Sequence, residues 1–182
     1  MKKILTQSFF NRPAPVVAQD LLGKYLVRKH GRTEAALMIT ETEAYEGWRD
    51  KASHASRGKT ARNEPMFGKA GVFYVYLCYG MYWMLNIVTG DEGYPAAVLV
   101  RGAEEGKGPG RLTKRLAIDK RFNEKPASQK TGLWFEDRGV EVPLRALQKT
   151  PRIGVAYAGE KWARKKWRFV LKRSEKNAPG PF

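Results

Sequence analysis

Short runs in which apolar and polar residues alternate recur along the chain, and they predict more strands than helices. Each run is bounded by glycine, proline or charged residues that favour turns. We expect strands at residues 24–29, 34–45, 96–104, 131–137, 152–157 and 167–172. The first two strands should flank a turn at His30-Gly31.

Apolar residues recur at helical spacing in only two segments. In the first, Val16, Val17, Leu21 and Leu22 share one face of a helix that ends near Gly23. The second helix should begin at Pro109, with inward-facing residues Leu112, Leu116 and Ile118. Strands outnumber helices and are not regularly interleaved with them, which indicates an α+β fold. We expect a compact single domain over residues 1–182: a mixed, largely antiparallel curved sheet with flanking helices and a protruding β-hairpin.

The uncharged segment from Gly71 to Val88 predicts that hairpin. The span 70–89 carries no charge for twenty residues, which is long enough for a membrane helix. Its period-two alternation and the turn-forming pair Tyr79-Gly80 favour a hairpin instead. One face of the first strand carries Val72, Tyr74, Tyr76 and Cys78, and the other carries Phe73, Val75, Leu77 and Tyr79.

The hairpin holds six aromatic residues between Val72 and Asn86, and four of them are tyrosines. A buried core explains most of these side chains, and we expect Phe73, Val75 and Leu77 to be plain core. Four tyrosines are more than a dry core favours, because each buried hydroxyl needs a hydrogen-bond partner. Aromatic faces also stack on nucleobases, and an apolar hairpin tip can enter a base stack.

Charge indicates the kind of partner. The chain has 34 Lys and Arg against 18 Asp and Glu, a formal net charge of +16, which favours a polyanion such as nucleic acid. Residues 107–130 and 161–176 each hold eight Lys or Arg. A solvated surface explains any single lysine, but two dense segments predict a phosphate-binding surface with salt-dependent binding.

Cysteine and histidine are scarce. With one cysteine, Cys78, no intramolecular disulfide forms, and with two histidines a zinc site of the Cys/His type lacks ligands. We therefore expect no zinc site of this type and a reducing, cytoplasmic location. The apolar runs near the N-terminus are too short and interrupted for a signal peptide.

Four carboxylates lie within ten residues of this basic chain: Glu41, Glu43, Glu46 and Asp50. Glu41, Glu43 and Tyr45 share one face of a strand because successive side chains alternate. A phosphate backbone repels a carboxylate, so one beside the substrate needs a task, such as activating water, which contributes about a hundred- to ten-thousandfold in rate. The alternative is ordinary surface pairing with Lys51, Arg57 or another base.

The polar loop that follows carries His54, Arg57, Arg62 and Asn63. The arginines and asparagine could grip a phosphate, although ordinary turns have the same composition. A lone histidine is more often a cap or a satisfied hydrogen bonder. Together, a basic surface, a carboxylate and stacking aromatics suggest an enzyme that flips a nucleotide out of the duplex and hydrolyses its glycosidic bond.

Two other classes remain to be weighed. In a non-catalytic nucleic-acid-binding module, the aromatics would stack bases and the carboxylates would be surface pairs. A helix-hairpin-helix glycosylase is suggested by the motif "GPGRL" at residues 108–112, but the full hairpin signature and a helix-dominated pattern are missing.

Several motifs in order resemble the alkyladenine (3-methyladenine) DNA glycosylases of the human-enzyme type. They are "ETEAY", "YVYLCYGMYWMLN", "AAVLVRGAE", "GPGRLTKRLAI" and "RIGVAYAGE", together with the spaced residues of "HASRGKTARNEPMF". The resemblance covers almost the entire chain, and the missing N-terminal extension of the mammalian enzymes suggests a prokaryotic member. It implies a compact mixed α/β domain without metal or cofactor that removes alkylated or deaminated purines and leaves an abasic site.

The resemblance also implies a role for individual residues. It selects Glu43 over Glu41 as the general base, and Arg101 resembles an arginine that lines the active site near the abasic sugar. The walls of the base pocket are Tyr45, His54 and Tyr76, and Asn86 screens purines by their 2-substituent. At the hairpin, Tyr79 takes the vacated place in the duplex and Met81 contacts the minor groove.

The expected activity is therefore a monofunctional DNA glycosylase, acting as a monomer on double-stranded DNA that contains damaged purines. Expected substrates are 3-methyladenine, 7-methylguanine, hypoxanthine and ethenoadenine, and the expected location is cytoplasmic and nucleoid-associated. No lyase activity is expected, although with so many lysines the residues themselves leave a Schiff-base mechanism open.

Overall fold

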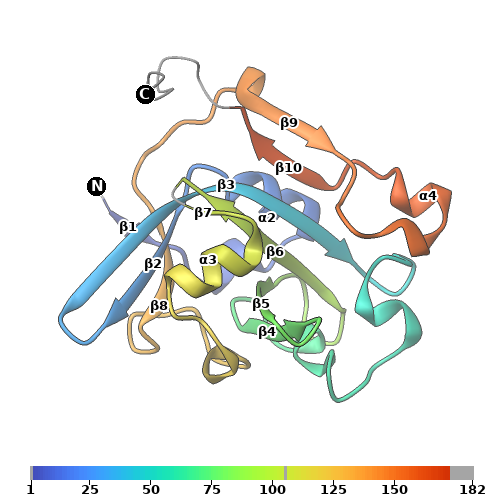
Figure 1. Cartoon of the computed structure of the whole chain (residues 1–182), viewed down its shortest axis with the longest axis horizontal. Helices are drawn as coiled ribbons and strands as arrows, with labels where there is room; N and C mark the ends of the chain where they lie inside the picture. Colours follow the sequence, from blue (N-terminus) through green and yellow to red (C-terminus); the bar gives the residue numbers. More distant parts are fainter. Residues whose placement is uncertain (1, 105, 173–182) are drawn as a thin grey trace.

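The computed structural model describes residues 2–104 and 106–172, with the backbone alone described at residues 106 and 107. Figure 1 shows its elements. The strands are β1 (Lys3–Ile4), β2 (Tyr25–His30), β3 (Thr33–Glu46), β4 (Phe73–Cys78), β5 (Tyr82–Val88), β6 (Ala96–Ala103), β7 (Gly106–Lys107), β8 (Leu133–Asp137), β9 (Leu147–Thr150) and β10 (Arg168–Leu171). The helices are α1 (Gln7–Phe10), α2 (Ala14–Asp20), α3 (Pro109–Arg115) and α4 (Glu160–Ala163), and the 3₁₀ turns are η1 (His54–Arg57), η2 (Glu64–Phe67), η3 (Lys120–Phe122), η4 (Leu144–Ala146) and η5 (Ala156–Ala158).

The strands form one ten-stranded sheet with the main order β1-β8-β2-β3-β6-β5-β4. Each pairing between these strands is antiparallel, including those of β10 with β3 and β9. The long strand β3 holds the sheet together: its first half pairs with β2, and its second half lies between β6 and β10. The predicted α+β fold with a largely antiparallel sheet is therefore confirmed.

The two faces of β3 meet different surroundings because its side chains alternate. Thr42 and Ala44 point toward α2, where the Thr42 hydroxyl donates to the Ala18 carbonyl at 2.7 Å and Ala44 joins the main core. In Figure 1, α2 lies behind β3 and β6, and α3 lies in front. Glu41 and Glu43 therefore face away from the α2 core.

The uncharged segment forms the predicted hairpin of β4 and β5. Its turn is closed by a 3.1 Å hydrogen bond from the Met81 N–H to the Cys78 carbonyl. Tyr79 and Gly80 have φ angles of 50° and 69°, as a two-residue type I′ turn requires. Over the residues that the structure describes, no helix has the length and hydrophobicity needed to cross a membrane.

Most predicted elements appear, with three corrections. In α2, Val17 is buried but Val16 is 40% exposed, so the helix turns Ala18 rather than Val16 into the core. Leu77 of the hairpin is 37% exposed and is not core. Residues 152–157 form no strand but a turn followed by η5. The chain turns at Gly154, whose φ is 74°, and the buried residues of this segment are Arg152 and Val155, which are three positions apart rather than two.

Candidate active site

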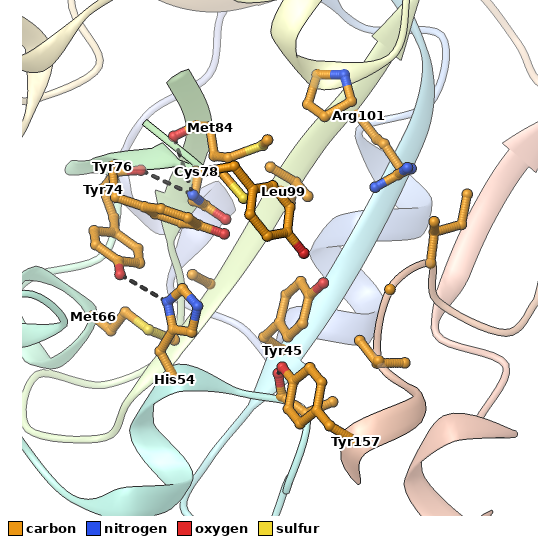
Figure 2. Close-up of a pocket in the computed structure, with 18 residues that line it drawn as sticks. Tyr45, His54, Met66, Tyr74, Tyr76, Cys78, Met84, Leu99, Arg101 and Tyr157 are labelled. Carbon is orange, nitrogen blue, oxygen red and sulfur yellow. Dashed lines mark hydrogen bonds between the residues drawn. The ribbon is translucent and has the colours of Figure 1, made fainter. Parts of the chain in front are cut away.

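A cavity of about 310 Å³ opens on the face of β3 away from α2 (Figure 2). Its walls come from β3, η1, the hairpin β4–β5, β6, the start of α3 and residues 153–157. The antiparallel sheet places β3, β6, β5 and β4 side by side, so one row of side chains from each strand meets here. The predicted site residues that line the cavity are Tyr45, His54, Tyr76, Tyr79, Asn86 and Arg101.

Glu43 lies directly behind this cavity wall, and its side chain is fully buried. Its Oε2 accepts a 2.9 Å hydrogen bond from the Tyr45 hydroxyl, and its Oε1 accepts one of 2.8 Å from the Ile153 N–H. Arg101 Nη1 lies 3.6 Å from Oε2. All three of these partners line the cavity, so the carboxylate lies one layer behind its surface.

Burial raises the pKa of Glu43 above its ordinary value, because a low-dielectric surrounding disfavours the charged form. Three contacts oppose this effect: the charge of Arg101, the Ile153 N–H and the Tyr45 hydroxyl. The pKa of the Tyr45 hydroxyl is itself raised, first by burial and then by the Glu43 charge, so it stays a donor. Glu43 thus has the raised pKa and specific partners of a functional carboxylate.

Arg101 reaches Glu43 from a β-bulge in β6. Glu41 pairs with Gly102 and Thr42 with Val100, which leaves Arg101 as the extra residue. Bulges re-aim side chains in this way, often beside active sites. Arg101 Nε lies 2.9 Å from Glu41 Oε1, an oxygen that Arg168 Nε also approaches at 2.6 Å. Glu41 is therefore not paired with Lys51 or Arg57 at the surface; it holds Arg101 beside Glu43.

The other two carboxylates of the cluster serve the scaffold. Glu46 Oε2 accepts a hydrogen bond of 2.5 Å from the Ala14 N–H at the start of α2. Asp50 forms a fully buried ion pair with Arg152. Neither Glu46 nor Asp50 lines the cavity.

Aromatic rings form the opposite wall. His54 and Tyr76 meet edge to face with ring centroids 4.8 Å apart, and the Tyr74 and Tyr76 rings lie 5.1 Å apart. His54 Nδ1 and the Tyr74 hydroxyl are hydrogen-bonded at 3.0 Å (Figure 2). Burial, followed by the nearby Arg62 charge, lowers the pKa of His54, so its imidazole is neutral at neutral pH. Burial also raises the pKa of Tyr74 to about 12.

Two hydrogen bonds fix the Asn86 side chain beside these aromatic rings. Its Nδ2 donates to the Tyr74 carbonyl at 3.0 Å and, more weakly, to the Met84 carbonyl at 3.4 Å. These two bonds set the plane of the amide in a residue that is only 3% exposed. A side chain held in this way cannot rotate freely to accommodate whatever enters the cavity.

The hairpin tip projects from the rim. Tyr79 is 88% exposed and Met81 is 67% exposed, and Met81 lies outside the cavity. Tyr79 also adopts a positive φ, which costs an ordinary side chain roughly 1 kcal/mol. Neither packing nor turn geometry explains an exposed aromatic ring at this position, where Asn or Gly fits better.

Hydrogen bonds fix two residues of the polar loop after β3. Asn63 is buried and ties the loop together, with Nδ2 donating to the His54 and Gly58 carbonyls and Oδ1 accepting from the Thr60 N–H. Of the two alternatives for Asn63, these bonds favour ordinary turn chemistry over contact with a phosphate. Arg62 Nη2 donates to the Leu77 carbonyl at 2.8 Å, which braces the hairpin.

Sequence reasoning gave no role to several cavity residues. Alternation places Tyr74 on the same strand face as Tyr76. This pattern is the sequence signal that could have identified Tyr74 as a cavity residue. Tyr157 is 66% exposed at the cavity mouth, and its hydroxyl donates to the Ala52 carbonyl at 2.9 Å. It was missed because it lies in the segment wrongly expected to be a strand. Cys78, Met84 and Leu99 also belong to this group.

Comparisons with known proteins identify the family of this chain. The family model for methylpurine-DNA glycosylase matches residues 8–107 and 103–175. Proteins named "Putative 3-methyladenine DNA glycosylase" are similar along their whole length. The one from Methanocella arvoryzae is 44% identical over 97% of this chain and 98% of its own, and that from Myxococcus xanthus is 45% identical over 97% and 94%. A Legionella pneumophila relative is 42% identical over 94% and 96%. The chain belongs to the methylpurine-DNA glycosylase family, which confirms the resemblance drawn from its motifs.

Proposed function

We propose that the protein is a monofunctional DNA glycosylase that flips an alkylated or deaminated purine into the cavity and hydrolyses its N-glycosidic bond. The observation that carries the proposal is the buried Glu43, joined to Tyr45, Ile153 and Arg101 behind an aromatic cavity. Family membership and the names of the relatives support a DNA glycosylase role. The expected substrates are 3-methyladenine, 7-methylguanine, hypoxanthine and ethenoadenine.

The cavity suits a damaged purine. Tyr45, His54 and Tyr76 offer ring faces and edges on different sides, so a flat base can stack without every edge atom being read. A purine alkylated at N3 or N7 carries a positive charge, which strengthens its attraction to aromatic faces. Asn86, fixed by its two carbonyl partners, then meets the edge of the base, where it excludes purines by their 2-substituent.

Bond cleavage uses the charge of Glu43. As the bond from C1′ to the base nitrogen breaks, its electron pair leaves with the base and positive charge builds on the sugar. The oxygen of a water molecule then bonds to C1′ while Glu43 takes its proton. A carboxylate beside the sugar also stabilises the developing charge. An alkylated base leaves as a neutral purine, whereas hypoxanthine also needs a proton.

Access to Glu43 requires a small rearrangement. The carboxylate is fully buried, with Tyr45 and Arg101 sharing Oε2. We expect Arg101, which Glu41 holds from behind, to turn toward the sugar when DNA binds and to leave room for water at Oε2. Arg101 would then act on the sugar together with Glu43, and the contact with Glu41 would hold Arg101 in position.

The hairpin tip is suited to base flipping. Tyr79 is the exposed ring at the turn, and we propose that it fills the stack left by the flipped nucleotide while Met81 contacts the minor groove. The basic surface holds the phosphates. Of the two basic segments, residues 173–176 and the side chain of Lys107 lie outside the described part of the chain. Monomeric action and a cytoplasmic, nucleoid-associated location stay predictions.

A base-release assay on methylated duplex DNA tests this function against a non-catalytic binding module. The glycosylase releases free 3-methyladenine and prefers a lesion duplex, whereas a binding module releases nothing and prefers single strands. Borohydride treatment during turnover separates water from a lysine nucleophile. We expect no trapped protein–DNA adduct, because the proposed nucleophile is water; a trapped adduct would indicate a Schiff base and lyase chemistry.

A further inference from the structure

Asp50 and Arg152 form an ion pair below the cavity in which both side chains are completely buried. Arg152 Nη2 donates to Asp50 Oδ1 at 2.8 Å, and Nη1 donates to Oδ2 at 2.5 Å. The planar guanidinium thus grips the carboxylate with two parallel hydrogen bonds. Neither residue lines the cavity, so the pair does not touch a bound base.

Stability alone does not explain this pair. Removing two charges from water is costly, and apolar replacements of similar size are often as stable or more stable. The Arg152 Nε is buried and has no hydrogen-bond partner among the described residues, which adds to the cost. A buried charge pair that also leaves a donor unpaired suggests a role other than stability, namely holding neighbouring groups in position.

Arg152 is connected to the surroundings of Glu43 in three ways. Arg152 precedes Ile153, whose N–H donates to Glu43 Oε1 at 2.8 Å. Arg152 Nη1 also donates to the carbonyl of Ala44, the residue between Glu43 and Tyr45, at 2.8 Å. Its guanidinium carbon lies 4.9 Å from the centre of the Tyr45 ring. One side chain therefore holds the donor of one Glu43 oxygen and packs against the donor of the other.

We propose that Arg152, fixed by Asp50, is a positioning residue for Glu43 that keeps the Ile153 N–H on Oε1 and the Tyr45 hydroxyl on Oε2. The inference rests on the proposed role of Glu43 as general base. It adds a role for two residues that lie outside the cavity and never meet the substrate.

The consequence is a pH effect with a definite sign. Burial raises the pKa of Glu43, and the Ile153 N–H opposes this by stabilising the carboxylate. Loosening the N–H contact therefore raises that pKa further. A general base works only when ionised, so the acidic limb of the rate profile moves to higher pH. The other charged or titratable groups around Glu43 are Glu41 and Tyr45 on β3, Tyr76 on β4, Arg101 on β6 and Arg168 on β10, and the test leaves them unchanged.

Arg152→Lys is the primary variant. Lysine keeps the charge, which avoids stranding Asp50, but lacks the fork that reaches Asp50 and Ala44 together. Single-turnover base release across the pH range should show an acidic limb about one to two pH units above that of the wild type, the size expected for a lost hydrogen bond to a carboxylate. Binding to lesion DNA should not change. If this variant does not fold, Asp50→Asn combined with Arg152→Met removes both charges and should show the same shift.

Ile153→Pro tests the contact between the Ile153 N–H and Glu43 directly, without changing Arg152. Proline removes the N–H itself without replacing either member of the Asp50–Arg152 pair. The next residue, Gly154, has a φ of 74°, and turns with such a glycine at the third position accept proline at the second. The acidic limb should move upward as it does for Arg152→Lys.

Arg138→Lys is the matched control. Arg138 Nε and Nη2 both contact Oε2 of the nearly buried Glu136 on β8, and Oε1 of the same carboxylate accepts from the Trp134 indole at 2.8 Å, away from the cavity. It should lower the melting temperature without moving the acidic limb. The proposal is overturned if Arg152→Lys, or the double variant, lowers the melting temperature but keeps the wild-type limb, or if Ile153→Pro does. Failure of the underlying function is distinct: Glu43→Gln would then still release base.

Discussion

The Tyr45 hydroxyl donates a 2.9 Å hydrogen bond to Glu43 Oε2, and both residues lie on the same face of β3. Their spacing of two residues brings them together because strand side chains alternate. The same tyrosine lines the cavity, so a single side chain both packs against the proposed substrate base and supports the proposed catalytic carboxylate.

Tyr45→Phe separates these two roles. The ring stays, but Glu43 loses a hydrogen bond that lowers its pKa, so that pKa should rise by about one unit. We expect lesion binding close to wild type and an acidic limb of base release displaced upward by about one pH unit. Equal loss of binding and rate, without displacement, would mean that the hydroxyl serves the base rather than Glu43.

Glu43→Gln should stabilise the fold at neutral pH. A raised folded pKa means that Glu43 contributes stability below the unfolded pKa, about 4.3, and that this contribution is lost as the pH rises through the folded value. Each unit of elevation corresponds to about 1.4 kcal/mol. Melting curves should show a gain of a few degrees at pH 7.5 that disappears near pH 4. A lower melting temperature at pH 7.5 would show that Arg101 and the other partners outweigh burial.

Tyr79→Asn tests the strained turn. Asn accepts positive φ and is favoured beside glycine in a type I′ turn, so the hairpin should be as stable or about 1 kcal/mol more stable. Tyr79→Ser should likewise change stability very little, because the ring is exposed. Both should weaken base flipping, measured by the fluorescence of a reporter base at the lesion. A large fall in melting temperature for either variant would place the ring in the core.

Glu41→Gln is compared with Glu43→Gln to distinguish the roles of the two carboxylates. The sequence alone predicts a mild effect. The structure adds that Glu41 holds both Arg101 and Arg168, so we expect about a tenfold lower rate, consistent with loss of one charge-assisted contact. Single-turnover rates of the two variants decide: a loss as large as that of Glu43→Gln would remove the distinction between the carboxylates.

Local sequence patterns predicted the fold well where side chains alternate between the two faces of a strand. Alternation in residues 72–88 gave β4 and β5, and Tyr79-Gly80 gave their turn. The same rule brought Glu43 and Tyr45 to one face. Family motifs then selected residues such as Asn86, which the structure places in the cavity wall.

Long-range contacts could not be predicted in this way. Residues 152–157 alternate like a strand, but the partner that draws Arg152 inward is Asp50, 102 positions earlier. The bulge that aims Arg101 depends on the register between β3 and β6 and leaves no mark in local composition. Asn63 looked like a phosphate ligand because turn residues and ligands share the same polar side chains.

The central claim is that Glu43 activates water for attack on the sugar. Glu43→Gln keeps the shape of the side chain and one acceptor oxygen but removes its basicity and charge. The most direct measurement is single-turnover release of 3-methyladenine by this variant, together with its affinity for the same lesion duplex. We predict that base release is lost while lesion binding remains; release at a rate close to that of the wild type would contradict the claim.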